Sequence, residues 1–235
     1  MHQIAIPHEV VAAVMKRLGR LHVFEEFDAR RSALIVIDMQ NAFVAPGCSR
    51  LQVPVAREIV PAINRLAAAF RAAGGTVVWT HMAAYDDGSW DVHFHRFMNA
   101  ERRAAILRTL ARGSEGYALY PELKADPADL IVEKTRYSVF HPGASRLDEE
   151  LRARGIDTVV ITGTLTNVCC ESSARDAMML DYNVVFVSDA TAAKTDAAHN
   201  ATLATMMQVF ADVMSTEEVE SRLRRGTPTR SVATS

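Results

Sequence analysis

Two hydrophobic periods alternate along the chain, and each predicts a different kind of element. Short continuous apolar runs rich in β-branched residues are typical of strands covered on both faces. Longer segments with apolar residues three and four positions apart predict amphipathic helices. The predicted strands are residues 32–37, 76–80, 130–133, 157–162, 184–187 and, at an edge, 209–213. The predicted helices are residues 7–18, 55–73, 100–111, 145–154, 197–207 and 216–224, with one more that starts at Cys169.

Strands and helices follow one another in turn, which predicts a parallel sheet joined by crossover helices. We therefore expect an α/β protein with a three-layer α/β/α fold and a mostly parallel, six-stranded, Rossmann-like sheet. Residues 31–225 would form this domain. Residues 1–30 precede the alternating pattern and predict an N-terminal helical arm that packs on a neighbouring subunit, whereas residues 226–235 predict a loose tail.

Three predicted strands are followed by residues whose side chains could take part in catalysis. Asp38 follows the first strand, Lys134 follows the third, and the turn that leads to Cys169 follows the fourth. Because ligands of such sheets bind beyond the carboxyl ends of the strands, we expect these side chains to converge. Asp38 would then act as general base for a thiol, and Lys134 would hold the ion pair. The alternatives are a carboxylate that caps the next turn and a solvated lysine at a strand end.

The turn after the fourth strand predicts a cysteine nucleophile. Gly163 breaks the strand, Thr166 or Asn167 can cap the helix, and Cys169 lies in its first turn. Unpaired N–H groups and the helix dipole favour a thiolate, can lower the pKa of the thiol and can hold an oxyanion. The alternative is a buried cysteine that packs the helix on the sheet. Cys170 is turned by about 100° from Cys169, so both cannot face one pocket.

The segment 82–97 has no clear period and is rich in aromatic residues and histidine. A long loop of this kind inside a compact domain is typical of a functional segment or an interface. Its histidines form no recognised metal motif, and the chain has no glycine-rich phosphate-binding motif. We therefore expect neither a metal nor a nucleotide cofactor.

Composition narrows the class of protein further. The 235 residues carry a net charge of −2 with both signs interspersed, which gives no basis for binding nucleic acid or an anionic membrane. The three cysteines suggest no disulfide framework, and Cys48 has no evident partner. No apolar run approaches the ~18 residues of a membrane span, and the first twenty residues lack the apolar core of a signal peptide. We expect a cytoplasmic protein.

Three segments resemble the signatures of the isochorismatase-like cysteine hydrolases. They are residues 36–43 (VIDMQNAF), 133–140 (EKTRYSVF) and 163–169 (GTLTNVC). The resemblance runs in the family's order from about residue 32 to residue 214, and three spaced motifs together are specific. The family includes nicotinamidase, N-carbamoylsarcosine amidohydrolase, biuret hydrolase and ureidoacrylate amidohydrolase.

The resemblance implies a catalytic set of Asp38, Lys134 and Cys169. It also implies a non-proline cis peptide between Thr164 and Leu165, with the N–H groups of Leu165 and Cys169 forming an oxyanion hole. Cys169 would attack an amide or ureido carbonyl and form a thioester, and no metal would be needed. Relatives form dimers and tetramers, so the resemblance implies a homodimer or homotetramer. We take Phe43, His81, Trp90, Tyr137 and Asn167 as candidate pocket residues.

Departures from individual relatives narrow the substrate. The stretch 81–84 lacks the Asp-x-His metal arrangement of nicotinamidases, and Cys169 argues against the vinyl ether chemistry of true isochorismatases, which lack the cysteine. The ureidoacrylate branch is most similar, although Cys170 replaces its usual valine. We expect an amidohydrolase acting on a small amide, carbamoyl or ureido compound. The alternatives are a nicotinamidase-like carboxamide hydrolase and a catalytically silent binding or assembly subunit.

Overall fold

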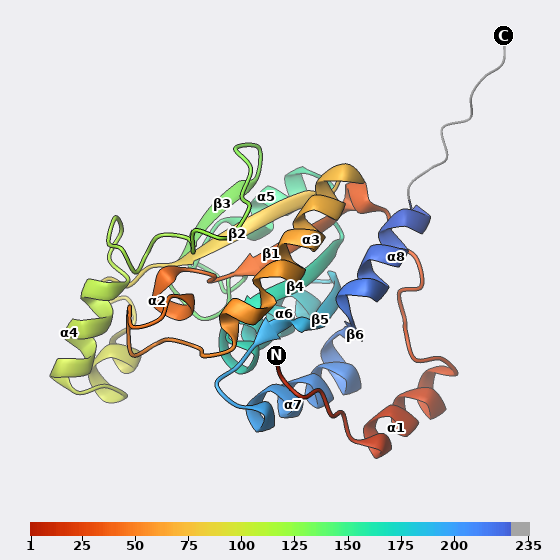
Figure 1. Cartoon of the computed structure of the whole chain (residues 1–235), viewed down its shortest axis with the longest axis horizontal. Coiled ribbons are helices and arrows are strands. Elements are labelled where there is room, and N and C mark those ends of the chain that lie inside the picture. Colours follow the sequence, from red (N-terminus) through yellow and green to blue (C-terminus); the bar gives the residue numbers. More distant parts are fainter. Residues whose placement is uncertain (227–235) are drawn as a thin grey trace, which may run out of the picture.

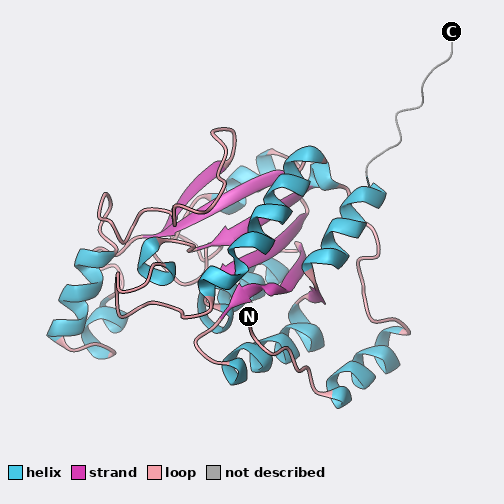
Figure 2. Ribbon diagram, viewed as in Figure 1, coloured by secondary structure: helices cyan, strands magenta, loops and turns pink. Residues whose placement is uncertain are grey.

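A six-stranded, all-parallel sheet forms the centre of the protein (Figures 1 and 2). The structure is a computed structural model and describes residues 1–226. The strands follow the order β3-β2-β1-β4-β5-β6. Their bounds are β1 Ser32–Ile37, β2 Thr76–Met82, β3 Leu130–Lys134, β4 Thr158–Thr164, β5 Asn183–Ala192 and β6 Asp212–Met214. The predicted α/β class and mostly parallel sheet are therefore confirmed. The order of the strands reverses between β1 and β4, which is the position where open parallel sheets bind ligands.

Helices cover both faces of the sheet and complete the three layers. On one face, α3 and α8 pack against side chains such as Leu34 and Val36 of β1. On the other face, α5, α6 and α7 pack against Ala33 and Ile35. Both faces of β1 are buried because successive side chains of a strand point to opposite sides. The α-helices are α1 His8–Leu18, α2 Asn41–Val44, α3 Val60–Ala72, α4 Ala100–Thr109, α5 Leu147–Ala153, α6 Glu171–Met179, α7 Asp196–Thr205 and α8 Thr216–Gly226.

A close approach of backbones joins the ends of β1 and β4. Gly163 pairs with Ile37 in the parallel register. Its φ is +103°, and a Cβ atom there would lie 2.1 Å from the carbonyl oxygen of Ile37. Only glycine fits such a contact, because any side chain would push the two strands apart. This contact brings the chain that follows β4 next to Asp38.

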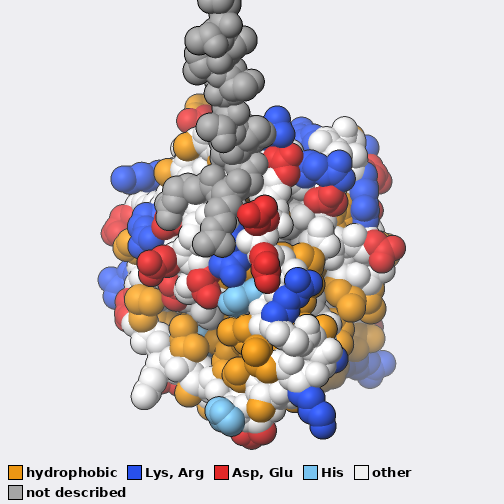
Figure 3. Space-filling view, turned by 90° about the vertical axis from the view of Figure 1, so that its right-hand side faces the viewer, with side chains coloured by type: hydrophobic (Ala, Val, Ile, Leu, Met, Phe, Trp, Pro, Cys, Tyr) orange, Lys and Arg blue, Asp and Glu red, His pale blue; other side chains and the backbone are white. Residues whose placement is uncertain are grey.

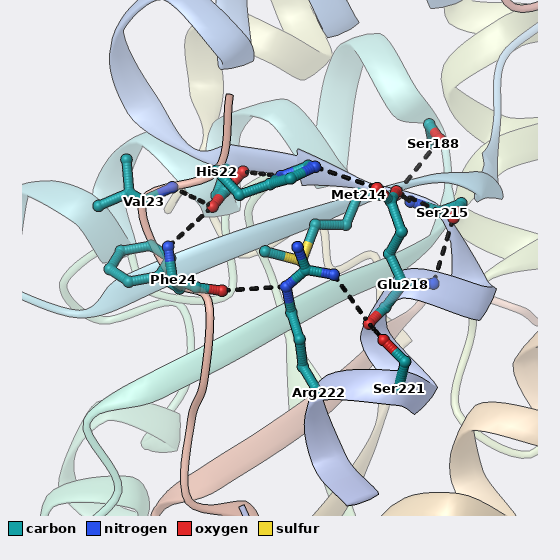
Figure 4. Close-up of polar contacts among 10 residues, drawn as sticks. His22, Val23, Phe24, Ser188, Met214, Ser215, Glu218, Ser221 and Arg222 are labelled. Carbon is teal, nitrogen blue, oxygen red and sulfur yellow. Dashed lines mark hydrogen bonds and ion pairs between the residues drawn. The ribbon is translucent and has the colours of Figure 1, made fainter. Parts of the chain in front are cut away.

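The N-terminal arm lies along the β6 edge of its own chain. Helix α1 buries Val10 and Val14. Figure 4 shows how the following segment is fixed: His22 Nδ1 lies 2.8 Å from Asp212, and its Nε2 lies 3.0 Å from Glu218 of α8. This side of the molecule also exposes apolar side chains, among them Leu18 and others grouped in Figure 3. The expected contact of the arm with a neighbouring subunit stays a prediction.

Several element boundaries differ from the predicted ones. The predicted edge strand 209–213 is wrong in its first half, because Met206–Phe210 forms a π-helical turn and β6 pairs with β5 only from Asp212. The loop 82–97 contains a second π-helical turn, Val92–Arg96. The predicted tail 226–235 lies outside the described residues, apart from Gly226. No helix within residues 1–226 has the length and apolar character that crossing a bilayer requires.

Candidate active site

A buried ion pair lies at the carboxyl end of the sheet. Lys134 ends β3 and Asp38 follows β1, and β2 lies between these strands. The Lys134 side chain extends past β2, so that its Nζ lies 2.8 Å from Oδ2 of Asp38. Both side chains are fully buried. The alternatives of a solvated lysine and a simple turn-capping carboxylate do not fit this geometry.

Hydrogen bonds fix both members of the pair. The hydroxyl of Thr80 donates to Oδ1 of Asp38 over 2.8 Å, and the Asp38 N–H donates to the same hydroxyl oxygen over 3.1 Å. Lys134 Nζ donates to the carbonyl of Arg136 over 3.0 Å and lies 3.4 Å from the sulfur of Met82. Asp38 has a φ of +49°, in the left-handed region that few side chains adopt readily. The carboxylate is thus held in one orientation.

Cys169 completes this group from the turn after β4. The turn is π-helical over Thr166–Cys170 and leads directly into α6. Its thiol is buried and interacts with both Asp38 and Lys134. The peptide bond between Thr164 and Leu165 is cis, and the Thr164 hydroxyl donates to the Asp38 carbonyl over 3.0 Å. The three side chains predicted to converge therefore do lie together.

Cys170 faces away from this group. Its sulfur lies 3.8 Å from the carbonyl of Thr162, inside the core between sheet and helices. Neither Thr166 nor Asn167 caps the turn with its side chain; Leu165 occupies the N-cap position. The hydroxyl of Thr166 instead pairs with the ring of His199 at 3.0 Å.

The electrostatics of the thiol differ from the predicted ones. Burial raises the pKa of Cys169 to about 12, because the loss of hydration outweighs the attraction of Lys134, and the negative charge of Asp38 raises it further. The expectation of a lowered pKa considered only the start of a helix and left out this burial. Burial by itself would lower the pKa of Lys134, but the charges of Asp38 and Cys169 raise it. Burial therefore favours the neutral form of the Cys169 thiol.

A cavity of about 560 Å³ opens at Cys169. Three of the predicted pocket residues, Phe43, Trp90 and Tyr137, line it, as does Leu165. The other two predicted pocket residues do not line this cavity. The buried ring of His81 stacks at a tilt on Tyr117, with Nδ1 3.1 Å from the Tyr117 carbonyl, and the Asn167 side chain is exposed to solvent.

Sequence reasoning missed other lining residues. The ring of His93 stacks on Trp90 with centroids 4.0 Å apart, and Trp90 meets Tyr137 edge to face at 4.9 Å. The aromatic composition of residues 82–97 was the available signal for this wall. Arg102 of α4 and Lys194, which follows β5, also line the cavity. Nothing local in the sequence indicated these two, because they come from separate segments.

No group of three or more His, Cys, Asp or Glu side chains within residues 1–226 is arranged to hold a metal ion. Among these residues, all three cysteines are free thiols.

Comparisons with known proteins agree with this geometry. The sequence model of the isochorismatase domain matches residues 32–218. A cysteine hydrolase from Pseudomonas syringae pv. phaseolicola 1448A is 33% identical, with a TM-score of 0.78 over 88% of this chain and 98% of that one. An N-carbamoylsarcosine amidase from Thermoplasma acidophilum is 29% identical, with a TM-score of 0.65 over 80% of this chain and 97% of that one. A pyrazinamidase/nicotinamidase from Streptococcus mutans UA159 is 28% identical, with a TM-score of 0.66 over 78% and 99%. The chain therefore belongs to the family of isochorismatase-like hydrolases.

Proposed function

We propose that this protein is a cysteine amidohydrolase that cleaves a C–N bond of a small amide, carbamoyl or ureido compound through a thioester. The observation that carries the proposal is the buried group of Asp38, Lys134 and Cys169 at the inner end of a substrate-sized cavity. The similarity to an N-carbamoylsarcosine amidase supports the same chemistry.

The first half of the reaction needs a base. Because burial raises the pKa of the Cys169 thiol far above neutrality, very little thiolate is present at pH 7 before a base removes the proton. Asp38 takes the thiol proton as the sulfur attacks the carbonyl carbon. The N–H groups of Leu165 and Cys169 stabilise the oxyanion. The C–N bond then breaks, and Asp38 returns the proton to the leaving nitrogen, which departs as ammonia or an amine.

The second half hydrolyses the thioester. Asp38 removes a proton from a water molecule, whose oxygen attacks the acyl carbon. The C–S bond breaks, the proton passes to the sulfur, and the acid product leaves. Lys134 orients Asp38 through the buried contact at 2.8 Å, and its charge compensates the carboxylate whenever Asp38 has given up the proton.

A neutral aromatic carboxamide is the second candidate substrate. The aromatic walls formed by Phe43, Trp90 and Tyr137 favour it, and so does the similarity to a pyrazinamidase/nicotinamidase. The same three side chains would perform the same steps on it.

The test is ammonia release from ureidoacrylate, N-carbamoyl amino acids, biuret, nicotinamide and simple carboxamides. We expect Cys169→Ser to lower kcat by at least about 10³-fold, because a hydroxyl is a far weaker nucleophile here. The matched control Cys170→Ser should stay within a few-fold of wild type, and a chelator should have no effect. An inactive Cys170→Ser with an active Cys169→Ser would refute the assignment of the nucleophile.

A further inference from the structure

We infer that the substrate carries an apolar body and, at the end away from the scissile C–N bond, an anionic group that Arg102 and Lys194 bind. This inference rests on the proposed amidohydrolase function and deepens it by naming the substrate class. It also chooses between an anionic substrate and a neutral carboxamide.

Two cavities meet at these cations. The cavity that contains Cys169 has about 560 Å³, and a neighbouring cavity has about 620 Å³. Leu51, Arg102, Ile106 and Lys194 line both of them. Arg102 and Lys194 therefore lie where the two cavities meet; below, the inner cavity is the one that contains Cys169, and the outer cavity is its neighbour. A substrate with its amide at Cys169 would extend toward them.

The charges at this opening are unbalanced. Among the described residues, no acidic side chain lines the inner cavity. Within residues 1–226, neither Arg102 nor Lys194 forms an ion pair, whereas nearby Arg50 pairs with Glu101 at 3.4 Å. Burial lowers the pKa of His93 in the inner cavity, and the nearby charges of Arg102 and Arg136 act in the same direction. A carboxylate could bind to these two cations, and a guanidinium can hold it through two parallel hydrogen bonds.

Most of the side chains that line the inner cavity are apolar, among them Phe43, Trp90, Tyr137, Phe97 and Met98. The side chain of Phe97 is 78% exposed, so a ligand that covered it would remove a large apolar surface from water. A small, wholly polar compound would leave the apolar surface of Phe97 exposed to water, and it would also lose its own hydration on binding. The walls therefore favour a ring or chain between the amide and the anion.

The test uses three ureas that differ in one feature at a time. The first, 4-(ureidomethyl)benzoate, has both an apolar ring and a distal carboxylate; benzylurea lacks the carboxylate, and N-carbamoylglycine lacks the ring. For the wild-type protein we expect kcat/KM for 4-(ureidomethyl)benzoate to exceed that for benzylurea and that for N-carbamoylglycine by about 10- to 150-fold. A gain of this size is expected from one set of charge-assisted hydrogen bonds or from the burial of one ring.

Substitutions then locate the anion site. Arg102→Gln should raise KM for 4-(ureidomethyl)benzoate by about tenfold with little change in kcat, and should leave benzylurea within about twofold. The control Lys16→Gln removes the same charge from exposed α1, away from both cavities, and should change neither compound. Equal loss for both compounds in Arg102→Gln, or equal turnover of both by wild type, would overturn the inference.

Calorimetric binding to the Cys169→Ser variant separates this inference from the proposed function. Suppose that the wild-type protein hydrolyses none of the ureas while Cys169→Ser binds 4-(ureidomethyl)benzoate at least tenfold more tightly than benzylurea. The inferred anion site is then supported, and the proposed amidohydrolase reaction is contradicted. If Cys169→Ser binds both compounds equally, or binds neither, the inference is overturned whatever the turnover.

Discussion

Replacing Lys134 by methionine tests the buried ion pair directly. Methionine has nearly the length of the lysine stem and no charge, so the substitution removes the ammonium and little packing. Oδ2 of Asp38 then loses the Nζ atom at 2.8 Å, and the carboxylate stays fully buried. Removing one partner of a buried pair costs about 3–5 kcal/mol, because the other charge is left without compensation. That is a large share of the roughly 5–15 kcal/mol that stabilises most domains.

The double variant Asp38→Asn/Lys134→Met shows whether the cost comes from the unpaired charge. Asparagine suits this position because it tolerates the positive φ of Asp38 and can still accept the Thr80 hydrogen bond. No buried charge remains, so we expect the double variant to be more stable than the sum of the single changes by about 2–4 kcal/mol. None of these variants should hydrolyse substrate.

Urea unfolding at one fixed protein concentration gives the free energies of unfolding, and the concentration matters if the chain associates. The surface control Lys16→Met should change the free energy of unfolding by no more than about 0.5 kcal/mol. The reasoning is refuted if Lys134→Met costs less than about 1 kcal/mol, or if the two single changes add within about 0.5 kcal/mol in the double variant.

Two further predictions concern titration. The rate at which iodoacetamide alkylates Cys169, followed by mass spectrometry of the peptide, should keep rising up to pH 9.5, because burial raises the thiol pKa to about 12; a plateau below pH 8 would contradict this. The hydrogen bond with Asp212 raises the pKa of His22, although burial opposes it. The contribution of His22 to stability should therefore be complete below about pH 6.5 and should fall as pH rises through the folded pKa. We expect His22→Gln to cost about 1–2 kcal/mol at pH 5.5 and less at pH 8.5, measured by urea unfolding. An unchanged cost across this range would disprove the link. Asp212→Asn should reduce the pH dependence without removing it, because Glu218 still lies 3.0 Å from Nε2 of His22.

The sequence by itself determined the order of elements and the convergence of three side chains. The apolar run 32–37 is β1 without any change of boundary, and Lys134 ends the third strand as the pattern indicated. These features are readable because a continuous run needs burial on both faces and because parallel strands end at the same edge of the sheet. Helix geometry indicated only that Cys169 and Cys170 cannot face one pocket, and the resemblance to the family signature pointed to Cys169; Cys170 does lie on another side of the turn.

Only the tertiary structure decided the extent of the last strand. Val209 and Phe210 have the composition of a strand, yet the Ala211 N–H donates to the carbonyl of Met206 and closes a helical turn instead. The side chain of Arg175, from α6, lies over the ring of Phe210 at 4.1 Å. Packing against another element thus outweighs local preference, which is weak for a short apolar run.

The tertiary structure also decided the chemistry of the site beyond its three central residues. The sequence placed Cys169 at a helix start, where a lowered pKa is expected, but burial at that place raises it instead. Arg102 and Lys194 meet at the cavity although 92 residues separate them in the chain (194 − 102). A local pattern records the propensity of neighbours along the chain, whereas hydration and charge depend on which segments meet in space.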